Sequence, residues 1–340
     1  MGFWSTTEAA PSWLSTWVSH DPGFLRPEPP PLPHIPPPYS LFHLTTNDAA
    51  AITALWRAHY GGEDWTWGGD EGAVLPYLAD GRVVGLGLRD ASRDLVATIF
   101  AVPMGETTRM SHGAALEDYG FHVVEGLVVE GGLRGQGVAG WMIAAIDGTV
   151  SRLRAPRPFA CLWAREVSRL PMFPTFVSCR PYAWKRCERA TLPTGWRLVS
   201  AAEFQPVWNA VVAAALSSGA PTLATTSMDV RRGGLLFLVG PKDYQDAVVI
   251  SDTCRRSRRD GERVYEIVYA TATTAATAIS AATAISAAAA AVTGLLFTTL
   301  PVGSEDGWTT GTSGYHAYSI YNYWPPAFGS CDLLFVREEL

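Results

Sequence analysis

The sequence predicts a mixed α+β fold in which two similar units follow one another along the chain. Its 340 residues correspond to one large domain or two ordinary ones. Hydrophobic residues make up 48% of them and charged residues 17%, which excludes a disordered chain and a coiled coil. An order of helix, strands, helix and strand occurs twice and restarts near Trp196. We therefore expect a proline-rich arm over residues 1–40, a first unit over 41–195 and a second unit over 196–340.

The arm is richest in proline between Pro22 and Pro38, where the sequence reads PGFLRPEPPPLPHIPPP. Proline lacks a backbone N–H and fixes φ, so this segment cannot form a helix or a central strand. We expect an extended arm, either packed on the body or loose, and an SH3-type ligand is the functional alternative. The first residues lack the basic and apolar regions of a secretory signal, although Gly2 and Thr6 fit the short N-myristoylation pattern.

The first unit begins with a helix that Asn47 or Asp48 can cap and that continues through Tyr60, because alanine and leucine recur there at helical spacing. The glycine-rich segment GGEDWTWGGDEG that follows is predicted to be a loop. Runs of β-branched residues then indicate strands, and one further amphipathic helix separates the last two. The expected elements are strands Gly81–Leu88, Asp94–Val102 and Phe121–Val129, a helix from Val138 to Val150, and a strand at Pro158–Ala164.

The second unit repeats this order. Its longest uncharged stretch, Ile267–Ser304, could span a bilayer by length, but alanine, threonine and serine dominate it and gain little from leaving water. We therefore expect a buried alanine-rich helix in a globular domain. The expected elements are helix Ala201–Leu216, strands Gly234–Val239, Ala247–Ile250 and Val264–Ala270, a helix from Thr271 to Val292, and strands Leu295–Leu300, Gly314–Tyr323 and Asp332–Arg337.

Charge and cysteine content exclude several functional classes. The 26 basic and 32 acidic side chains give a net charge of −6, which argues against a general nucleic-acid-binding protein. The five cysteines form no C-x-x-C pair and are odd in number, so we expect reduced thiols, a cytoplasmic location and no metal site. The one basic run, Arg255–Arg259, is predicted to be a solvated hairpin loop, and contact with nucleic acid or an anionic membrane is the alternative.

The most specific local signal is the segment VVEGLVVEGGLRGQGVAGWMIAAID, Val123 to Asp147. A β-rich run ends at Glu130, a turn with four glycines follows, and then a helix begins. Glycines let a ligand approach the backbone, and the unpaired amides at a helix start favour a pyrophosphate. An ordinary strand-to-helix turn is the alternative. The candidate cofactor-binding residues are Leu127, Val128, Leu133, Arg134, Gly135, Gln136, Gly137, Val138 and Ala139.

This segment resembles the acyl-CoA-binding motif R/Q-x-x-G-x-G/A of the GNAT N-acyltransferase superfamily, one glycine short of the usual spacing. Further stretches, in the same order along almost the whole chain, resemble one family of tandem GNAT-like chains, the N-myristoyltransferases. The stretches are PYSLFHL (Pro38–Leu44), WRAHYGGEDWTW (Trp56–Trp67), VVEGLVVEGGLRGQGVAG (Val123–Gly140), LPMFPTFVSCRPYAWKR (Leu170–Arg186) and SIYNYWPPAFGSCDLLFVREEL (Ser319–Leu340).

The resemblance implies transfer of a fatty acyl group from an acyl-CoA such as myristoyl-CoA to the N-terminal glycine amine of a protein. In this family the C-terminal carboxylate, here that of Leu340, is the base that takes a proton from the amine. A carboxylate is a weak base, so a dry site must raise its pKa or destabilise the ammonium. Two successive backbone amides at a β-bulge, by position those of Gly126 and Leu127, would stabilise the negative charge on the thioester oxygen.

The same resemblance implies a monomer that binds acyl-CoA and an acceptor peptide through its second unit and through an acidic, aromatic loop, without metal, nucleic acid or a transmembrane segment. The implied acceptor-binding residues are Tyr60, Glu63, Asp64, Trp163, Ala164, Tyr182, Ser313, Gly314 and Asn322.

The chain departs from the family pattern at several positions. Ala164 stands where the family has a threonine, Lys185 where it has a histidine, and the segment Gly311–Gly314 lacks the family's aspartate. Gln136 and Gly137 stand where the family is usually cationic. Each lost polar contact costs about 1–3 kcal/mol. Two alternatives therefore stay open: an N-acyltransferase with a different acceptor or a shorter acyl chain, and a non-catalytic binding or structural protein that kept the fold.

Overall fold

We analysed a computed structural model of the chain. It describes residues 23–24, 31–62, 64–103, 121–153, 160–167, 176–200, 202–204, 206–207, 209–210, 223–224, 234–241, 243–270, 278–298, 307–321, 323–324 and 334–335. Thirteen of the described strands form one continuous sheet. Along the sheet they follow the order β2 (Ser40–His43), β4 (Val84–Arg89), β5 (Leu95–Pro103), β6 (Phe121–Val129), β7 (Ala160–Val167), β15 (Thr309–Tyr321), β8 (Phe176–Cys187), β14 (Gly294–Thr298), β13 (Arg263–Ala270), β12 (Asp243–Ser257), β11 (Leu235–Gly240) and β9 (Arg197–Leu198), with β3 (Trp65–Trp67) beside β12.

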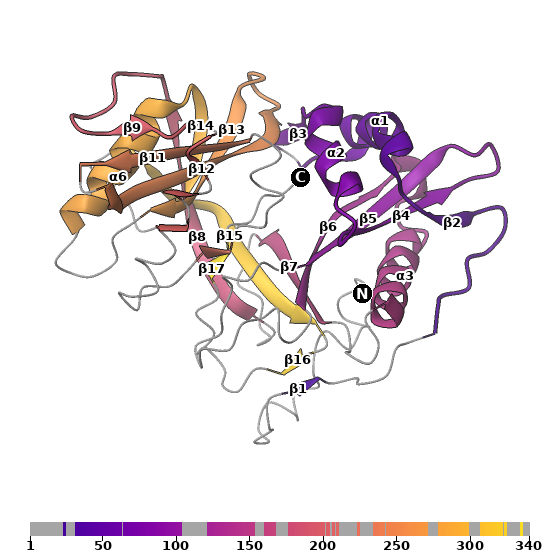
Figure 1. The fold of residues 1–340 in the computed structure, drawn as a ribbon. Helices are drawn as coiled ribbons and strands as arrows, with labels where there is room; N and C mark the ends of the chain where they lie inside the picture. The colour runs from indigo at the N-terminus through magenta and orange to yellow at the C-terminus, as the bar shows by residue number, and fades with distance from the viewer. Residues whose placement is uncertain are drawn as a thin grey trace.

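The sheet contains the same motif twice. Strands β6 and β7 are parallel and are joined through helix α3 (Val138–Leu153), and strands β13 and β14 are parallel and are joined through helix α6 (Ala278–Ala291). Parallel neighbours require such a crossover. The two long strands β8 and β15 then exchange places: β15 pairs with β7, β8 pairs with β14, and the two pair with each other (Figure 1). The mixed α+β class predicted from the sequence is therefore confirmed, and a strand–helix–strand crossover is present in both halves of the sheet.

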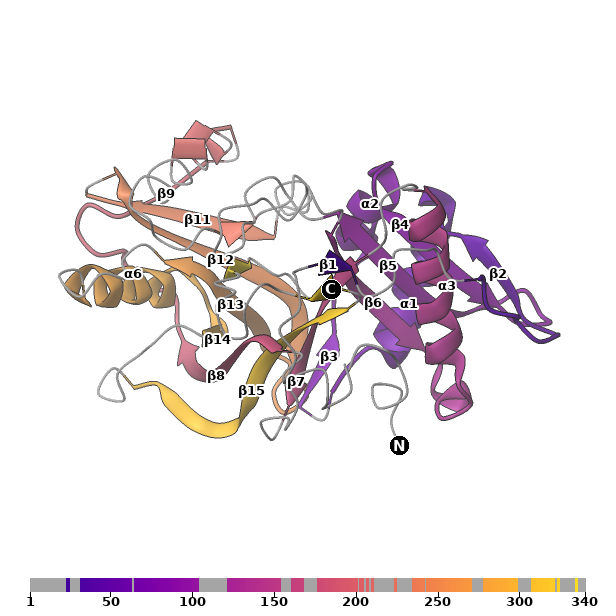
Figure 2. The same cartoon turned by 90° about the horizontal axis from the view of Figure 1, so that it is seen from below.

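The first repeat is a three-layer arrangement. Helix α3 packs on one face of β4, β5 and β6, and helices α1 (Ala49–His59) and α2 (Glu71–Ala79) lie on the other face (Figures 1 and 2). The α3 layer buries aliphatic side chains such as Met142 and Ile146, whereas the α1 layer buries the aromatic side chains of Trp56, Tyr77 and Phe100. Alternate residues of β5 point into the two layers, as expected for a strand buried on both faces.

The second repeat buries the alanine-rich helix, as predicted. Ala287 and Ala288 of α6 are fully buried in a cluster with Leu238, Val248 and Leu296 of the sheet. Small side chains let this helix approach the strands closely. No helix in the described part of the chain is long and apolar enough to cross a membrane.

Several elements were missed by the sequence patterns. Residues 61–72 were predicted to be a loop, but they contain β3 and the start of α2. Strands β2 and β8 were not predicted, because β2 is short and proline interrupts the sequence of β8. The arm is packed rather than loose where it is described: strand β1 (Gly23–Phe24) pairs with β16 (Tyr323–Trp324), and Ile35 and Tyr39 pack on the α3 layer. A further short pair joins β10 (Leu223–Ala224) to β17 (Leu334–Phe335), and most of the helix predicted at 201–216 lies outside the described residues.

Candidate active site

A β-bulge interrupts β6 at its centre. Thr98 of β5 lies opposite Val128, but Phe100 lies opposite Glu125, so β6 has one residue more than β5 between these pairs. The extra residue shifts the alternation of side chains. Val124 before the bulge and Val129 after it therefore both face the α3 layer, although they are five positions apart and an odd spacing in a regular strand would put them on opposite faces. The bulge is the one that the family resemblance placed at residues 126 and 127.

Glycine is required at this bulge for two reasons. Gly126 has a φ of +61°, a conformation that side chains with a Cβ rarely adopt. A Cβ at this position would lie 2.8 Å from the Phe100 ring and 2.9 Å from the Trp56 ring, and both rings are fully buried. The backbone of β6 thus lies directly against the aromatic α1 layer.

A chain of two buried hydrogen bonds holds the bulge in place. The indole Nε1 of Trp56 donates to Oγ1 of Thr98 at 2.8 Å, and the same hydroxyl donates to the carbonyl oxygen of Gly126 at 2.9 Å. Trp56 and Thr98 are both fully buried. A hydroxyl both accepts and donates, so the Trp56 indole N–H, the Thr98 hydroxyl and the Gly126 carbonyl are all hydrogen-bonded.

Strands β6 and β7 separate just before the bulge. Their parallel pairing covers Phe121 to Val123 of β6 and Ala160 to Leu162 of β7. Beyond this point β7 pairs with β15 on its other side. The edge of β6 that carries Gly126 and Leu127 therefore has no pairing to β7, and no other described strand pairs with it there.

The predicted phosphate loop, Gly131–Gly137, is exposed at the start of α3. A Cβ built on Gly132, Gly135 or Gly137 would meet no atom of the described residues within 4 Å, so no described side chain covers the loop at these positions. Gly135 and Gly137 have φ values of +80° and +84°. No hydrogen bond from the described part of the chain occupies the amides of Gly135, Gly137 and Val138. Such amides at a helix start suit an anion, and a diphosphate fits their exposure and polarity.

The Arg134 side chain connects the loop to β6 and to the end of α1 through hydrogen bonds. Its Nε donates to the Val129 carbonyl oxygen at 3.2 Å, and its Nη2 donates to the carbonyl oxygen of His59 at the end of α1. The Gly131 amide in turn donates to Nδ1 of His59 at 3.2 Å. A polar cavity of about 140 Å³ adjoins these contacts, and Arg57 and Arg258 are among the residues that line it. The structure therefore gives Arg134 a positioning role, and its contact with a phosphate stays a prediction.

The other predicted cofactor-binding residues lie around the loop. Leu127 and Leu133 are half-buried against the α3 layer, Val128 and Val138 are buried, and Ala139 is half-buried at the first turn of α3. Gln136 is exposed, and its side-chain Nε2 donates back to the Gly132 carbonyl oxygen at 2.9 Å.

The predicted acceptor-binding residues lie in three places. Tyr60 packs its ring between Trp56 and Trp65, and exposed Asp64 accepts a backbone hydrogen bond from Arg258. Trp163 and Ala164 lie in β7, Tyr182 in β8, and Ser313 and Gly314 in an irregular part of β15 where the register shifts against β8. Glu63, Asn322 and Leu340 lie outside the described residues, so the predicted carboxylate base is not located.

The basic run is a contact between the two repeats as well as a hairpin. Arg255 and Arg256 extend β12 alongside β3, and the Arg255 guanidinium lies 4.0 Å from the centre of the Trp65 ring. Arg258 donates to the Gly62 carbonyl oxygen at 3.0 Å. The predicted hairpin loop, Arg255–Arg259, is therefore confirmed only in part: Arg255 to Ser257 belong to β12, and the turn begins at Arg258.

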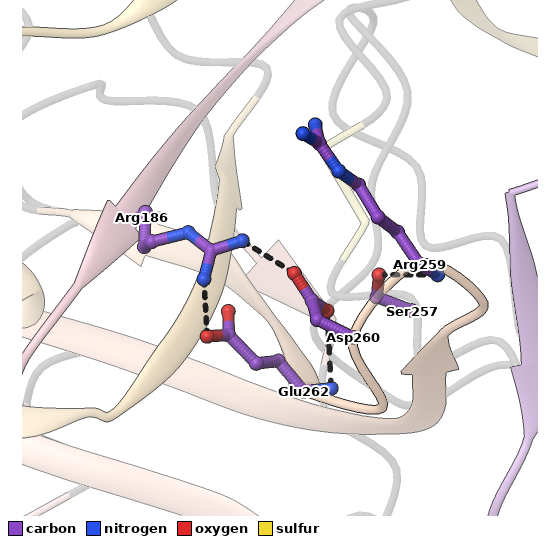
Figure 3. A network of polar contacts seen from close by, with 5 residues as sticks. All are labelled: Arg186, Ser257, Arg259, Asp260 and Glu262. Atoms are coloured by element: carbon purple, nitrogen blue, oxygen red, sulfur yellow. Dashed lines mark hydrogen bonds and ion pairs between the residues drawn. The ribbon is translucent and has the colours of Figure 1, made fainter.

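An ion-pair network fixes that hairpin to β8. The Arg186 guanidinium pairs with the carboxylates of Asp260 and Glu262 (Figure 3). The Asp260 pKa is held below its usual value, first by a hydrogen bond from Ser257 and then by Arg186. The Arg186 side chain is 51% exposed, so this network shapes the surface rather than a buried site.

Thr98 and Trp56 were missed by the sequence reasoning. The hydrogen bond between them spans 42 residues, and that from Thr98 to Gly126 spans 28. A lone threonine within a hydrophobic strand sequence, followed by a strand sequence that contains a single glycine, is the signal that could have suggested them.

The repeated crossover, the bulge before a glycine-rich helix start, and the exchange of β8 and β15 define the class of fold: two tandem GNAT-like units in one chain. Among solved structures, two of Saccharomyces cerevisiae N-myristoyltransferase with bound myristoyl-CoA have this fold. They match with TM-scores of 0.69 and 0.70 and 12% and 13% identity, over 98% of this chain and 98% and 94% of theirs. A third, with bound myristoyl-CoA and inhibitors, matches with a TM-score of 0.68 at 12% identity over 94% of this chain and 92% of its own.

The chain therefore has the N-myristoyltransferase fold. No family model and no curated protein matches it in sequence. The likeness is one of architecture, and the chemistry has to be argued from the residues present.

Proposed function

We propose that the protein is an acyl-CoA-dependent N-acyltransferase that moves a fatty acyl group such as myristoyl from coenzyme A to the N-terminal glycine amine of a protein. The observation that carries the proposal is the combination of an open, glycine-rich helix start with a bulged strand that directly precedes it. The Gly135, Gly137 and Val138 amides suit the diphosphate, and the Gly126 and Leu127 amides at the bulge would supply donors for the thioester oxygen.

The reaction is an attack of a neutral amine on a thioester carbonyl. The amine nitrogen forms a bond to the carbonyl carbon, negative charge develops on the oxygen, and the bond to the coenzyme A sulfur then breaks. The Gly126 and Leu127 amides would stabilise that charge. The Leu340 carboxylate would take the proton from the ammonium, and a dry site would strengthen it as a base. The peptide would contact the loop around Tyr60 to Asp64 and residues of β7, β8 and β15.

The direct test measures both binding and transfer with the full chain. Calorimetry with myristoyl-CoA should give a saturable isotherm, and mass spectrometry should show a glycine-initiated peptide gaining a myristoyl group. The matched control is the same peptide with an acetylated N-terminus, which has no free amine. If the protein does not bind myristoyl-CoA, the proposal is wrong.

Two alternatives are separated by the same assay. Because Ala164 lacks the hydroxyl and Ser313 lacks the carboxylate of the family pattern, a different acceptor or a shorter acyl chain is the second candidate. Competition among acetyl-, palmitoyl- and myristoyl-CoA distinguishes chain lengths. A non-catalytic protein is the third candidate. Extending the chain by a few residues beyond Leu340 would displace a catalytic carboxylate and abolish turnover, but it would leave a structural role intact.

A further inference from the structure

The buried hydroxyl of Thr98 lies beside the proposed reaction site without belonging to it. It accepts a hydrogen bond from Trp56 Nε1 at 2.8 Å and donates one to the carbonyl oxygen of Gly126 at 2.9 Å. A threonine with no exposed surface in a strand of aliphatic and aromatic residues has a polar group that must be satisfied internally. The partner it takes is the carbonyl of the bulge residue itself.

Peptide planarity gives this contact a consequence for the next amide. The carbonyl oxygen of Gly126 and the N–H of Leu127 belong to one trans peptide unit, so the two groups point in opposite directions. Thr98 lies on β5, on one side of β6. With the carbonyl held toward β5, the Leu127 N–H is directed to the other side. That side is the edge at which pairing with β7 has ended after Val123.

We propose that Thr98, supported by Trp56, is a positioning residue: it fixes the peptide unit between Gly126 and Leu127 so that the Leu127 amide is aimed at the thioester oxygen of a bound acyl-CoA. This inference rests on the proposed function and adds residues that contact neither the substrate nor the cofactor. The φ of +61° at Gly126 makes such a restraint necessary, because glycine by itself would leave that peptide unit free to rotate.

The arrangement of Trp56 makes the restraint directional. A hydroxyl has one proton, and an indole N–H can only donate. Since Trp56 donates to Thr98, the Thr98 proton is left to point at the Gly126 carbonyl. Removing the hydroxyl would leave the Trp56 N–H and the Gly126 carbonyl without their partners, and the peptide unit would lose its preferred direction.

The test compares Thr98→Val, which keeps the shape and removes the hydroxyl, with Thr98→Ser, which keeps the hydroxyl. Loss of an oxyanion donor lowers kcat by about 10²–10³-fold. For a donor that is misdirected rather than lost, we expect Thr98→Val to lower kcat at least about tenfold while the KM for myristoyl-CoA changes less than about twofold. Thr98→Ser should keep most of the activity. Thr98→Ala serves as a second variant without the hydroxyl if Thr98→Val does not fold.

The matched control is Thr53→Val. Thr53 is also buried, in α1, and its hydroxyl has no hydrogen-bond partner in the described structure. Thr53→Val makes the same replacement at a buried site without breaking a described hydrogen bond, so a general effect of the replacement would appear in both variants, whereas a positioning role would lower kcat for Thr98→Val alone. Equal kcat in Thr98→Val and the wild type would overturn the inference and leave the proposed function standing.

Hydrogen exchange at the Leu127 amide provides a readout that needs no turnover. With myristoyl-CoA bound, this amide should exchange more slowly in the wild type and in Thr98→Ser, and the protection should be lost in Thr98→Val. If the wild type binds myristoyl-CoA but transfers nothing, the proposed function fails and the exchange result alone decides the inference. Equal protection in all three proteins overturns it, as does a wild type that does not bind myristoyl-CoA.

Discussion

The two repeats share a frame but differ at the place where chemistry would occur. In both, the first strand of the parallel pair has a bulge of one residue against its antiparallel neighbour: at Gly126 in β6, and at Val268 in β13. The crossover that follows β6 reads GGLRGQG, with four glycines and an arginine, whereas residues 271–277 after β13 read TATTAAT. The bulge is thus present in both repeats, whereas the glycine-rich turn sequence is present in the first copy alone.

The comparison predicts that the first bulge does not tolerate a side chain. Gly126→Ala adds a Cβ at a φ of +61° and within 3 Å of the buried Phe100 and Trp56 rings. Strain and overpacking together should lower the free energy of unfolding by about 2–5 kcal/mol. Urea denaturation measures this. Gly132→Ala is the control, because its Cβ meets open space. Equal midpoints for the two variants would show that the bulge can relax.

The second repeat should be most sensitive in its helix rather than at its bulge. Ala288 in α6 is fully buried against the sheet, so Ala288→Leu should cost about 1–3 kcal/mol through overpacking. Ser286→Leu places the same side chain on the exposed face of the same helix and should change the midpoint little. Thermal denaturation of the two variants tests how closely α6 approaches the strands. A tolerated Ala288→Leu would contradict the close packing described above.

A smaller effect is expected in the glycine-rich turn of the first repeat. Gly137 has a φ of +84°, but a Cβ at this position would meet no atom within 4 Å, so Gly137→Ala should cost about 1 kcal/mol from backbone strain alone. The added methyl group would also enter the space in which the proposed diphosphate binds, so myristoyl-CoA affinity should fall in calorimetry. Gly132→Ala again is the control for stability. Unchanged affinity in Gly137→Ala would show that the diphosphate does not bind at this turn.

The parts of this comparison that could be predicted from the sequence are those encoded locally. The strands that became β4, β5, β6 and β13, and helix α3, followed from hydrophobic runs and glycine punctuation, and the bulge position followed from the family resemblance. The Thr98 contacts and the exchange of β8 and β15 join residues far apart in the chain, so no local pattern encodes them. Helix α2 was missed because glycines and an aspartate precede it and Pro76 lies within it.

The ion-pair network between the β12–β13 hairpin and β8 should respond weakly to pH. The Asp260 pKa is lowered, first by Ser257 and then by Arg186, so the carboxylate contributes stability above the ordinary aspartate pKa of about 3.9. That contribution is lost as the pH falls through the lower pKa of the folded state, where the carboxylate becomes protonated. Arg186→Gln should therefore lower the Tm slightly at neutral pH, and the difference from the wild type should shrink in acid.

The smallness of this effect follows from the exposure of the network, because solvent screens surface ion pairs. Arg189→Gln is the matched control, since Arg189 is a nearby exposed arginine that forms no ion pair with a described residue. It should give the same Tm difference from the wild type at both pH values. A difference for Arg186→Gln that grew as the pH fell would have the wrong sign for a lowered Asp260 pKa. The hairpin would then be held to β8 by packing and backbone pairing instead of by charge.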